Sequence, residues 1–167
     1  GGVNMDRLTR LQKEMPWEAA LVVSGVNRFY LTGFFSSAGI LLLTKKEAFL
    51  LVDARYIQAA EERVKNCRVV LEDGRQLPKI LSEQNVRQIA FESNYLSVEA
   101  AEKLKERIAP ASLVWSNEFG KLLLDLRSRK DAQELNCLRQ AQSITDRAFD
   151  RLLGQIHPGV SELELMI

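Results

Sequence analysis

The chain of 167 residues contains one histidine and only two cysteines. His157 precedes Pro158 at the end of a helical pattern, where an imidazole fits the helix dipole better than it fits a metal site. Cys67 and Cys137 lie far apart, and neither has a histidine or an acid placed to activate it. These scarcities argue against a histidine-built metal centre, a disulfide framework and a thiol nucleophile. They favour a reducing, cytoplasmic environment.

Long apolar runs and an excess of charge of one sign are also lacking. No apolar run approaches the length that crosses a bilayer, and no segment has the pattern of a signal peptide. Lys and Arg number 23 against 22 Asp and Glu, and the two signs are interleaved rather than blocked. This balance excludes the basic footprint of a nucleic-acid-binding protein. We expect no membrane and no nucleic acid among the partners, and a core of ordinary size.

Motifs that carry chemistry are equally scarce. The runs "VSGVN" and "TGFFSSAG" match neither common phosphate-loop pattern, and both are interpreted as turns. A Ser-His-Asp triad would have to recruit His157 across a domain boundary. The residues themselves therefore indicate no catalytic and no metal-binding centre in this chain.

Apolar spacing predicts an α/β fold with an antiparallel start. Leu8, Leu11 and Met15 predict a helix that ends before Pro16. The run "AALVVS" predicts a buried strand, and "GILLLT" and "AFLLVD" around the polar "KKE" predict a hairpin. Helices and strands then alternate as a helix from Ala54, strand "CRVVLE", helix "LPKILSEQ", strand "RQIAFE", helix "SVEAAEKLKERI" with Ser97 as its N-cap, and strand "SLVW". Strands separated by helices imply parallel pairing, so the sheet is expected to be mixed.

The polar segment "LRSRKDAQE" predicts a boundary between residues 1–126 and residues 127–167. Asp131 and Glu134 have capping-box spacing and open a long helix. Its apolar face is formed by Leu135, Leu138, Ala141, Ile144, Ala148, Leu152 and Ile156. Ser161 and Glu164 repeat the capping-box spacing close to the last residue. We therefore expect the chain to be a piece of a longer protein, in which most of the surface that packs against this apolar face lies in the missing part.

Four stretches, in order, carry a family resemblance: "NRFYLTGFFSSAGILLLT", "FLLVDARYIQAAEE", "IAFESNYLS" and the segment from "LRSRKDAQE" to "HPGVSELEL". They resemble the N-terminal domain and the start of the catalytic domain of the creatinase and Xaa-Pro peptidase family, which includes prolidase and aminopeptidase P. The resemblance implies a mixed-sheet α/β domain of ribonuclease-H-like or creatinase-like topology. The first helices of a "pita-bread" catalytic domain would follow it.

The same resemblance implies a dinuclear centre of manganese, cobalt or zinc in the catalytic domain, bound by two Asp, one His and two Glu. None of these ligands can be placed on this sequence, so no cofactor is expected in this chain. For the N-terminal domain the resemblance implies contact with the second subunit of a homodimer and partial covering of that subunit's active site. The peptide substrate would then be bound only through the missing domain.

Four residues are candidates for the surface that shapes substrate access: Phe34, Phe35, Arg55 and Tyr56. For each of them a structural role competes with the access role. Both phenylalanines could be buried, or one could be buried while its neighbour projects. Arg55 and Tyr56 could anchor a turn in which Asp53 caps the following helix.

Three functions stay open at this point. The first is the non-catalytic N-terminal region of an Xaa-Pro dipeptidase or aminopeptidase. The second is an interaction module of a pseudo-peptidase, and the third is part of a creatinase-like C–N hydrolase. The long helix from 131 to 156 is further expected to self-associate, because large exposed apolar patches are unusual on soluble monomers.

Overall fold

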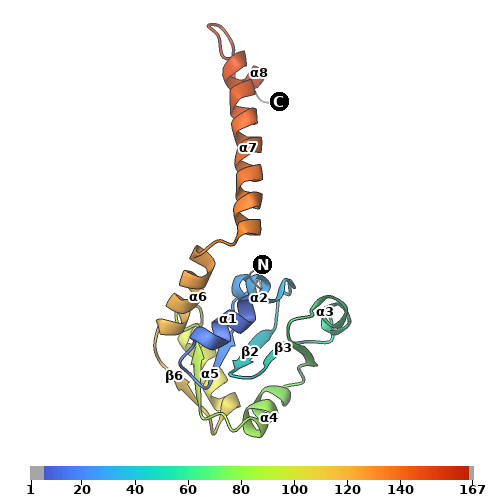
Figure 1. Cartoon of the computed structure of the whole chain (residues 1–167), viewed down its shortest axis with the longest axis vertical. Helices are drawn as coiled ribbons and strands as arrows, with labels where there is room; N and C mark the ends of the chain where they lie inside the picture. Colours follow the sequence, from blue (N-terminus) through green and yellow to red (C-terminus); the bar gives the residue numbers. More distant parts are fainter. Residues whose placement is uncertain (1–5, 166–167) are drawn as a thin grey trace. The chain divides into compact units, whose positions relative to one another are not determined.

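A computed structural model describes residues 6–165 of the protein (Figure 1). Its six-stranded sheet has the order β4-β3-β2-β1-β5-β6. The strands are β1 (Ala19–Val22), β2 (Ile40–Thr44), β3 (Ala48–Val52), β4 (Arg68–Leu71), β5 (Gln88–Phe91) and β6 (Ser112–Val114). Strand β2 is antiparallel to both of its neighbours, whereas the other three pairs are parallel. The predicted mixed α/β sheet and its antiparallel hairpin are confirmed.

Eight helices lie among the described residues. They are α1 (Arg7–Glu14), α2 (Gly25–Thr32), α3 (Ile57–Arg63), α4 (Gln76–Glu83), α5 (Val98–Ile108), α6 (Glu118–Ser128), α7 (Ala132–Gln155) and α8 (Glu162–Leu165). The predicted helix before Pro16 is confirmed as α1. The predicted cap is confirmed as well, because the Ser97 side chain accepts a hydrogen bond from the amide of Ala100 and begins α5.

Both faces of the sheet are covered, so the sheet has two apolar cores. In β1, Ala20 and Val22 belong to one core while Ala19 and Leu21 belong to the other, because successive side chains of a strand point to opposite faces. Helices α1, α2, α3 and α6 contribute to the first core, and α4 and α5 contribute to the second. Strands buried on both faces explain why the runs "AALV" and "AFLLV" are continuously apolar rather than alternating.

Two helices were not anticipated from the sequence. The prediction of a turn at "VSGVN" was wrong, because Ser24 caps α2 by accepting from the amide of Asn27 at 3.3 Å. The buried side of α2 includes Arg28 and Thr32 beside Leu31, so apolar periodicity does not reveal it. Helix α6 runs through "KLLLD" into the polar segment 126–134, where only residues 129–131 separate α6 from α7.

The chain divides into two compact units, the first ending at Arg127 and the second beginning at Ser128. The second unit contains α7 and α8. The predicted capping box of α7 is confirmed, since Asp131 Oδ1 accepts from the Glu134 amide at 2.8 Å and Glu134 Oε2 accepts from the Asp131 amide at 2.9 Å. The Glu164 side chain of the second predicted capping box lies outside the described residues. Within the described part of the chain, no helix has the length and apolarity to span a membrane.

The assignment of the first core predicts how much stability is lost when a buried side chain in the middle of the sheet is truncated. Leu43 in β2 is fully buried, so we expect Leu43→Ala to lower the free energy of unfolding by about 2–5 kcal/mol. The matched control is Leu124→Ala, because Leu124 in α6 is 64% exposed. Urea denaturation measures both variants. Equal stability of the two would contradict the assigned core.

Candidate functional site

Five of the six strands point in one direction, so the carboxyl ends of β1, β3, β4, β5 and β6 share one edge of the sheet. Open α/β sheets bind ligands at this edge. Polar residues stand within two positions of the strand ends there: Ser24 after β1, Asp53 after β3 and Glu92 after β5. We call this set of strand ends and loops the carboxyl edge and describe it as the candidate site.

Glu92 follows β5, which is adjacent to β1 in the sheet, and is only 2% exposed. Its Oε2 accepts hydrogen bonds from the amides of Val23 at 2.6 Å and Ser24 at 2.8 Å. Its Oε1 accepts from Ser24 Oγ at 2.7 Å and from Asn27 Nδ2 at 2.6 Å. Four donors occupy the acceptor positions of this carboxylate, so its buried charge is satisfied. Glu92 is consequently a structural anchor and not an open base or a metal ligand.

Arg28, which is 3% exposed, continues this anchor towards the next loop. Its guanidinium donates to the carbonyl of Val23 and, at 2.9 Å, to the carbonyl of Ser36. Burial lowers the pKa of Arg28, while Tyr95 and Glu92 act in the opposite direction. One buried cation thus joins the end of β1 to the loop of residues 33–39.

The loop of residues 33–39 carries two of the residues selected from the sequence. Phe34 is 5% exposed and belongs to the first core, whereas Phe35 is 70% exposed. Ser36 is again buried, at 3% exposure. The loop closes at Gly39, where φ is +135° and an added Cβ would lie 2.8 Å from the carbonyl oxygen of Leu51. The Phe35 side chain therefore projects into solvent, while the residues before and after it in the chain are buried.

Arg55 and Tyr56, the other two selected residues, lie after β3 and meet the same loop. The Tyr56 ring packs edge-on against Phe34 with centroids 6.4 Å apart. Its hydroxyl lies 2.7 Å from Ser37 Oγ and accepts from the Ser37 amide at 3.3 Å. The Arg55 guanidinium stands 5.3 Å from the centroid of the Tyr56 ring. The fold therefore brings Phe34, Arg55 and Tyr56 together beside the exposed Phe35.

Asp53 organises the turn that holds Arg55. Its Oδ1 accepts from the Arg55 amide at 2.9 Å, and its Oδ2 pairs with Arg55 Nη2 at 2.7 Å. The Arg55 side chain holds the pKa of Asp53 below its ordinary value and has its own pKa raised in return. The Asp53 carbonyl, not its carboxylate, accepts from the amide of Ile57 at the start of α3. Asp53 thus stabilises the turn before α3 and is not a side-chain cap of that helix.

Metal-ligating side chains do not cluster among the described residues of the carboxyl edge. Among residues 6–165 no group of three or more His, Cys, Asp or Glu side chains is arranged to hold a metal ion. The described residues therefore do not fit a dinuclear metal centre. Cys67 is half-buried, and burial raises the pKa of its thiol to about 11, so it stays protonated at neutral pH.

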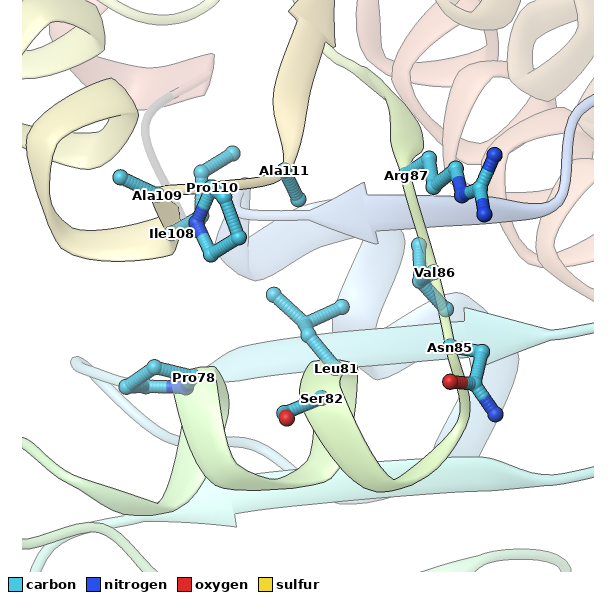
Figure 2. A pocket seen from close by; sticks show the side chains of 10 residues that line it. All are labelled: Pro78, Leu81, Ser82, Asn85, Val86, Arg87, Ile108, Ala109, Pro110 and Ala111. Atoms are coloured by element: carbon cyan, nitrogen blue, oxygen red, sulfur yellow. The ribbon is translucent and has the colours of Figure 1, made fainter.

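A pocket of about 200 Å³ lies at the opposite edge of the sheet (Figure 2). Its walls are the end of α4, the chain entering β5 at Val86 and Arg87, and the link from α5 to β6 at Pro110. Figure 2 shows the Leu81 side chain rising from α4 towards Pro110. This pocket is smaller than usual ligand sites and lies at the amino ends of β5 and β6.

Sequence reasoning missed Glu92, Arg28 and Ser24 as members of the site. A carboxylate directly after the apolar run of a strand, in "IAFES", was the available signal for Glu92. Nothing in the sequence indicates its partners, because Ser24 lies 68 positions away from Glu92.

A mixed six-stranded sheet whose carboxyl edge is anchored by Glu92 defines the class of domain to which the first unit belongs. A family model described as Creatinase/Prolidase N-terminal domain matches residues 5–128. The chain belongs to this family.

Relatives of the chain are peptidases by name. It is 31% identical over 158 residues to a putative Xaa-Pro aminopeptidase of Mycoplasma pneumoniae, covering 93% of this chain and 43% of the relative. It is 27% identical over 165 residues to the uncharacterized peptidase YqhT of Bacillus subtilis, covering 96% of this chain and 46% of that one. The chain thus spans less than half the length of these curated relatives.

Solved structures agree with this assignment. An Xaa-Pro dipeptidase from Bacillus anthracis superposes with a TM-score of 0.77 at 28% identity, over 95% of this chain and 44% of the other. The N-terminal domain of cytoplasmic peptidase PepQ from Mycobacterium tuberculosis gives a TM-score of 0.62 at 27% identity, over 70% of this chain and 97% of that domain. The chain therefore resembles the N-terminal part of Xaa-Pro peptidases.

The Glu92 network predicts a large effect of removing the carboxylate. We expect Glu92→Leu to lower the free energy of unfolding by about 3 kcal/mol or more, because each buried donor left without an acceptor costs about 1–3 kcal/mol. Glu92→Gln, which retains one carbonyl oxygen, should cost less. Urea denaturation measures both, with Glu102→Leu on an exposed part of α5 as the matched control. A Glu92→Leu variant as stable as the control would contradict the anchoring role.

Proposed function

We propose that this chain is the non-catalytic N-terminal region of a metal-dependent peptidase that cleaves Xaa-Pro bonds. In this proposal the two divalent ions, manganese, cobalt or zinc, and all their ligands belong to the part of the relatives' length that this chain does not span. The peptide substrate then meets this chain only at the mouth of the active site. A cytoplasmic location accords with the related domain of a peptidase named cytoplasmic.

The observation that carries the proposal is the exposed Phe35 on an anchored loop. Phe35 is 70% exposed, yet its neighbours Phe34 and Ser36 are 5% and 3% exposed. A large apolar side chain held out from a fixed backbone loses little conformational entropy on contact, as is typical of residues that carry binding energy. Arg55 is exposed on the turn that meets this loop, and its guanidinium, which pairs with Asp53, can also meet a peptide carboxylate or a second subunit.

A homodimer is the assembly that this proposal requires. In the access role, the loop of residues 33–39 of one subunit lies at the mouth of the other subunit's active site. The exposed apolar residues of α7 are a second surface that needs a partner. Those that share one side of the helix are Leu135, Leu138, Phe149 and Leu153.

The access role is tested in the peptidase that carries this region. We expect Phe35→Ala to raise KM for an Xaa-Pro dipeptide about fivefold with kcat nearly unchanged, since it removes a binding contact and not a catalytic group. The melting temperature should stay within about 2 °C, because Phe35 contributes little buried area.

Two control variants separate access from stability. Phe34→Ala, at the buried neighbour, should lower the melting temperature strongly. Val98→Ala, at a 77% exposed position on α5, should change neither KM nor stability. Unchanged KM in Phe35→Ala would overturn the access role, whereas a wild-type protein that does not hydrolyse Xaa-Pro dipeptides would favour an interaction module.

Self-association through α7 is tested on the chain itself. Leu138 and Phe149 lie on the same side of α7 and are 53% and 57% exposed. We expect the weight-average sedimentation coefficient to rise with concentration above the value for a monomer of 18.9 kDa. The double variant Leu138→Glu, Phe149→Glu should remain monomeric, whereas Asn136→Glu, Ser143→Glu on the opposite side should behave as the wild type. A wild-type monomer at all concentrations would count against this surface.

A further inference from the structure

A second pocket, of about 440 Å³, opens at the carboxyl edge. Its lining comes from the residues after β1, the residues after β5 and the helix α6 that follows β6. The strands β1 and β5 are adjacent and parallel. The chain leaves β1 towards β2 on one side and leaves β5 towards β6 on the other. The pocket therefore lies between two adjacent strands whose following connections leave in opposite directions. This is the usual ligand position in open α/β sheets.

The floor of this pocket is the saturated carboxylate of Glu92. Its four acceptor positions are filled by the amides of Val23 and Ser24, by Ser24 Oγ and by Asn27 Nδ2. It has no acceptor position left for a metal ion or an ammonium group. Asn27 is engaged on its other side too, since its Oδ1 accepts from Arg127 Nη1 at 3.3 Å. The floor is thus a rigid, satisfied surface that does not recruit a cation.

The walls, in contrast, carry cations and hydrogen-bond donors. Lys121 and Arg127 on α6 are the two cations of the lining, and Glu92 is its one carboxylate. The side-chain amides of Asn94 and Asn117 add further donors. Asn94 lies directly against α6, because a Cβ added at Gly120 would meet Asn94 Oδ1 at 2.8 Å. The Glu92 carboxylate is buried and engaged by four donors, so the side chains that face a ligand are Lys121, Arg127 and the two amides, which favour an anion.

The rim of the pocket is apolar. Val26 on α2, Tyr95 after β5 and Leu124 on α6 line it and are 60%, 59% and 64% exposed. A volume of about 440 Å³ with a few polar groups and an apolar rim lies in the range of small-molecule sites. An inorganic ion would leave this rim uncovered, whereas an organic anion would cover it.

We propose that this pocket binds a small organic anion whose carboxylate or phosphate lies beside Lys121 and Arg127 and whose apolar part covers Val26 and Leu124. The proposal is independent of the peptidase function, because it concerns binding to this chain alone. Three probes that share one ring test it: phenyl phosphate, benzoate and the uncharged benzyl alcohol. Each is titrated at constant ionic strength while the amide signals of Asn94, Asn117 and Gly120 are followed by two-dimensional NMR.

We expect saturable shifts with at least one of the two anions and none with benzyl alcohol. Stronger binding of phenyl phosphate would assign a phosphate ester, and stronger binding of benzoate would assign a carboxylic acid. Lys121→Glu should weaken anion binding about fivefold or more, because it reverses a charge at the site. Lys13→Glu on α1, which makes the same change in net charge away from the pocket, should leave the affinity unchanged.

Three results would overturn the proposal. They are shifts that never saturate with either anion, equal binding of benzyl alcohol, or equal weakening by Lys121→Glu and Lys13→Glu. Lys121 is exposed, so its variant is expected to fold, and the dispersion of the same spectra verifies this.

Discussion

The buried carboxylate of Glu92 is the interaction on which the carboxyl edge depends. An ionised group at 2% exposure is tolerated only when hydrogen bonds replace the water it has lost, and four donors do so here. Two of them are backbone amides at the end of β1, and the other two are the cap and the first turn of α2. The same group therefore ties β5 to β1 and sets where α2 begins.

Arg28 extends this constraint to the loop that follows α2. It lies on the buried side of α2 and donates to the carbonyls of Val23 and Ser36. Because the loop is held from inside, its exposed residue Phe35 has a defined position. The edge can therefore serve as a contact surface. Such a fixed surface suits the accessory region of a larger enzyme that we propose.

Much of the fold could be predicted from the sequence because its signals are local. The helical spacing of Leu8, Leu11 and Met15, the apolar runs of β1 to β3 and the Ser97 cap each depend on a few neighbouring residues. Helix α2 could not be predicted, since its buried side includes Arg28, whose burial is explained only by carbonyls brought close by the fold. The pocket beside Lys121 was missed for the same reason, as its walls come from three separate strand ends. The sequence likewise left open which of the adjacent residues Phe34 and Phe35 is buried and which projects.

The sequence by itself determined the class of the fold, the hairpin, the capping box at Asp131 and the family to which the chain is similar. These follow from periodicity, caps and short motifs, which act over a few residues. Only the tertiary structure decided that Phe34 is buried while Phe35 is exposed, that Tyr56 packs on Phe34, and that Glu92 meets Ser24 across 68 positions. The physical reason is that burial and the pairing of buried charges depend on which distant strands become neighbours. That order is set by the packing of the whole sheet and not by any one segment.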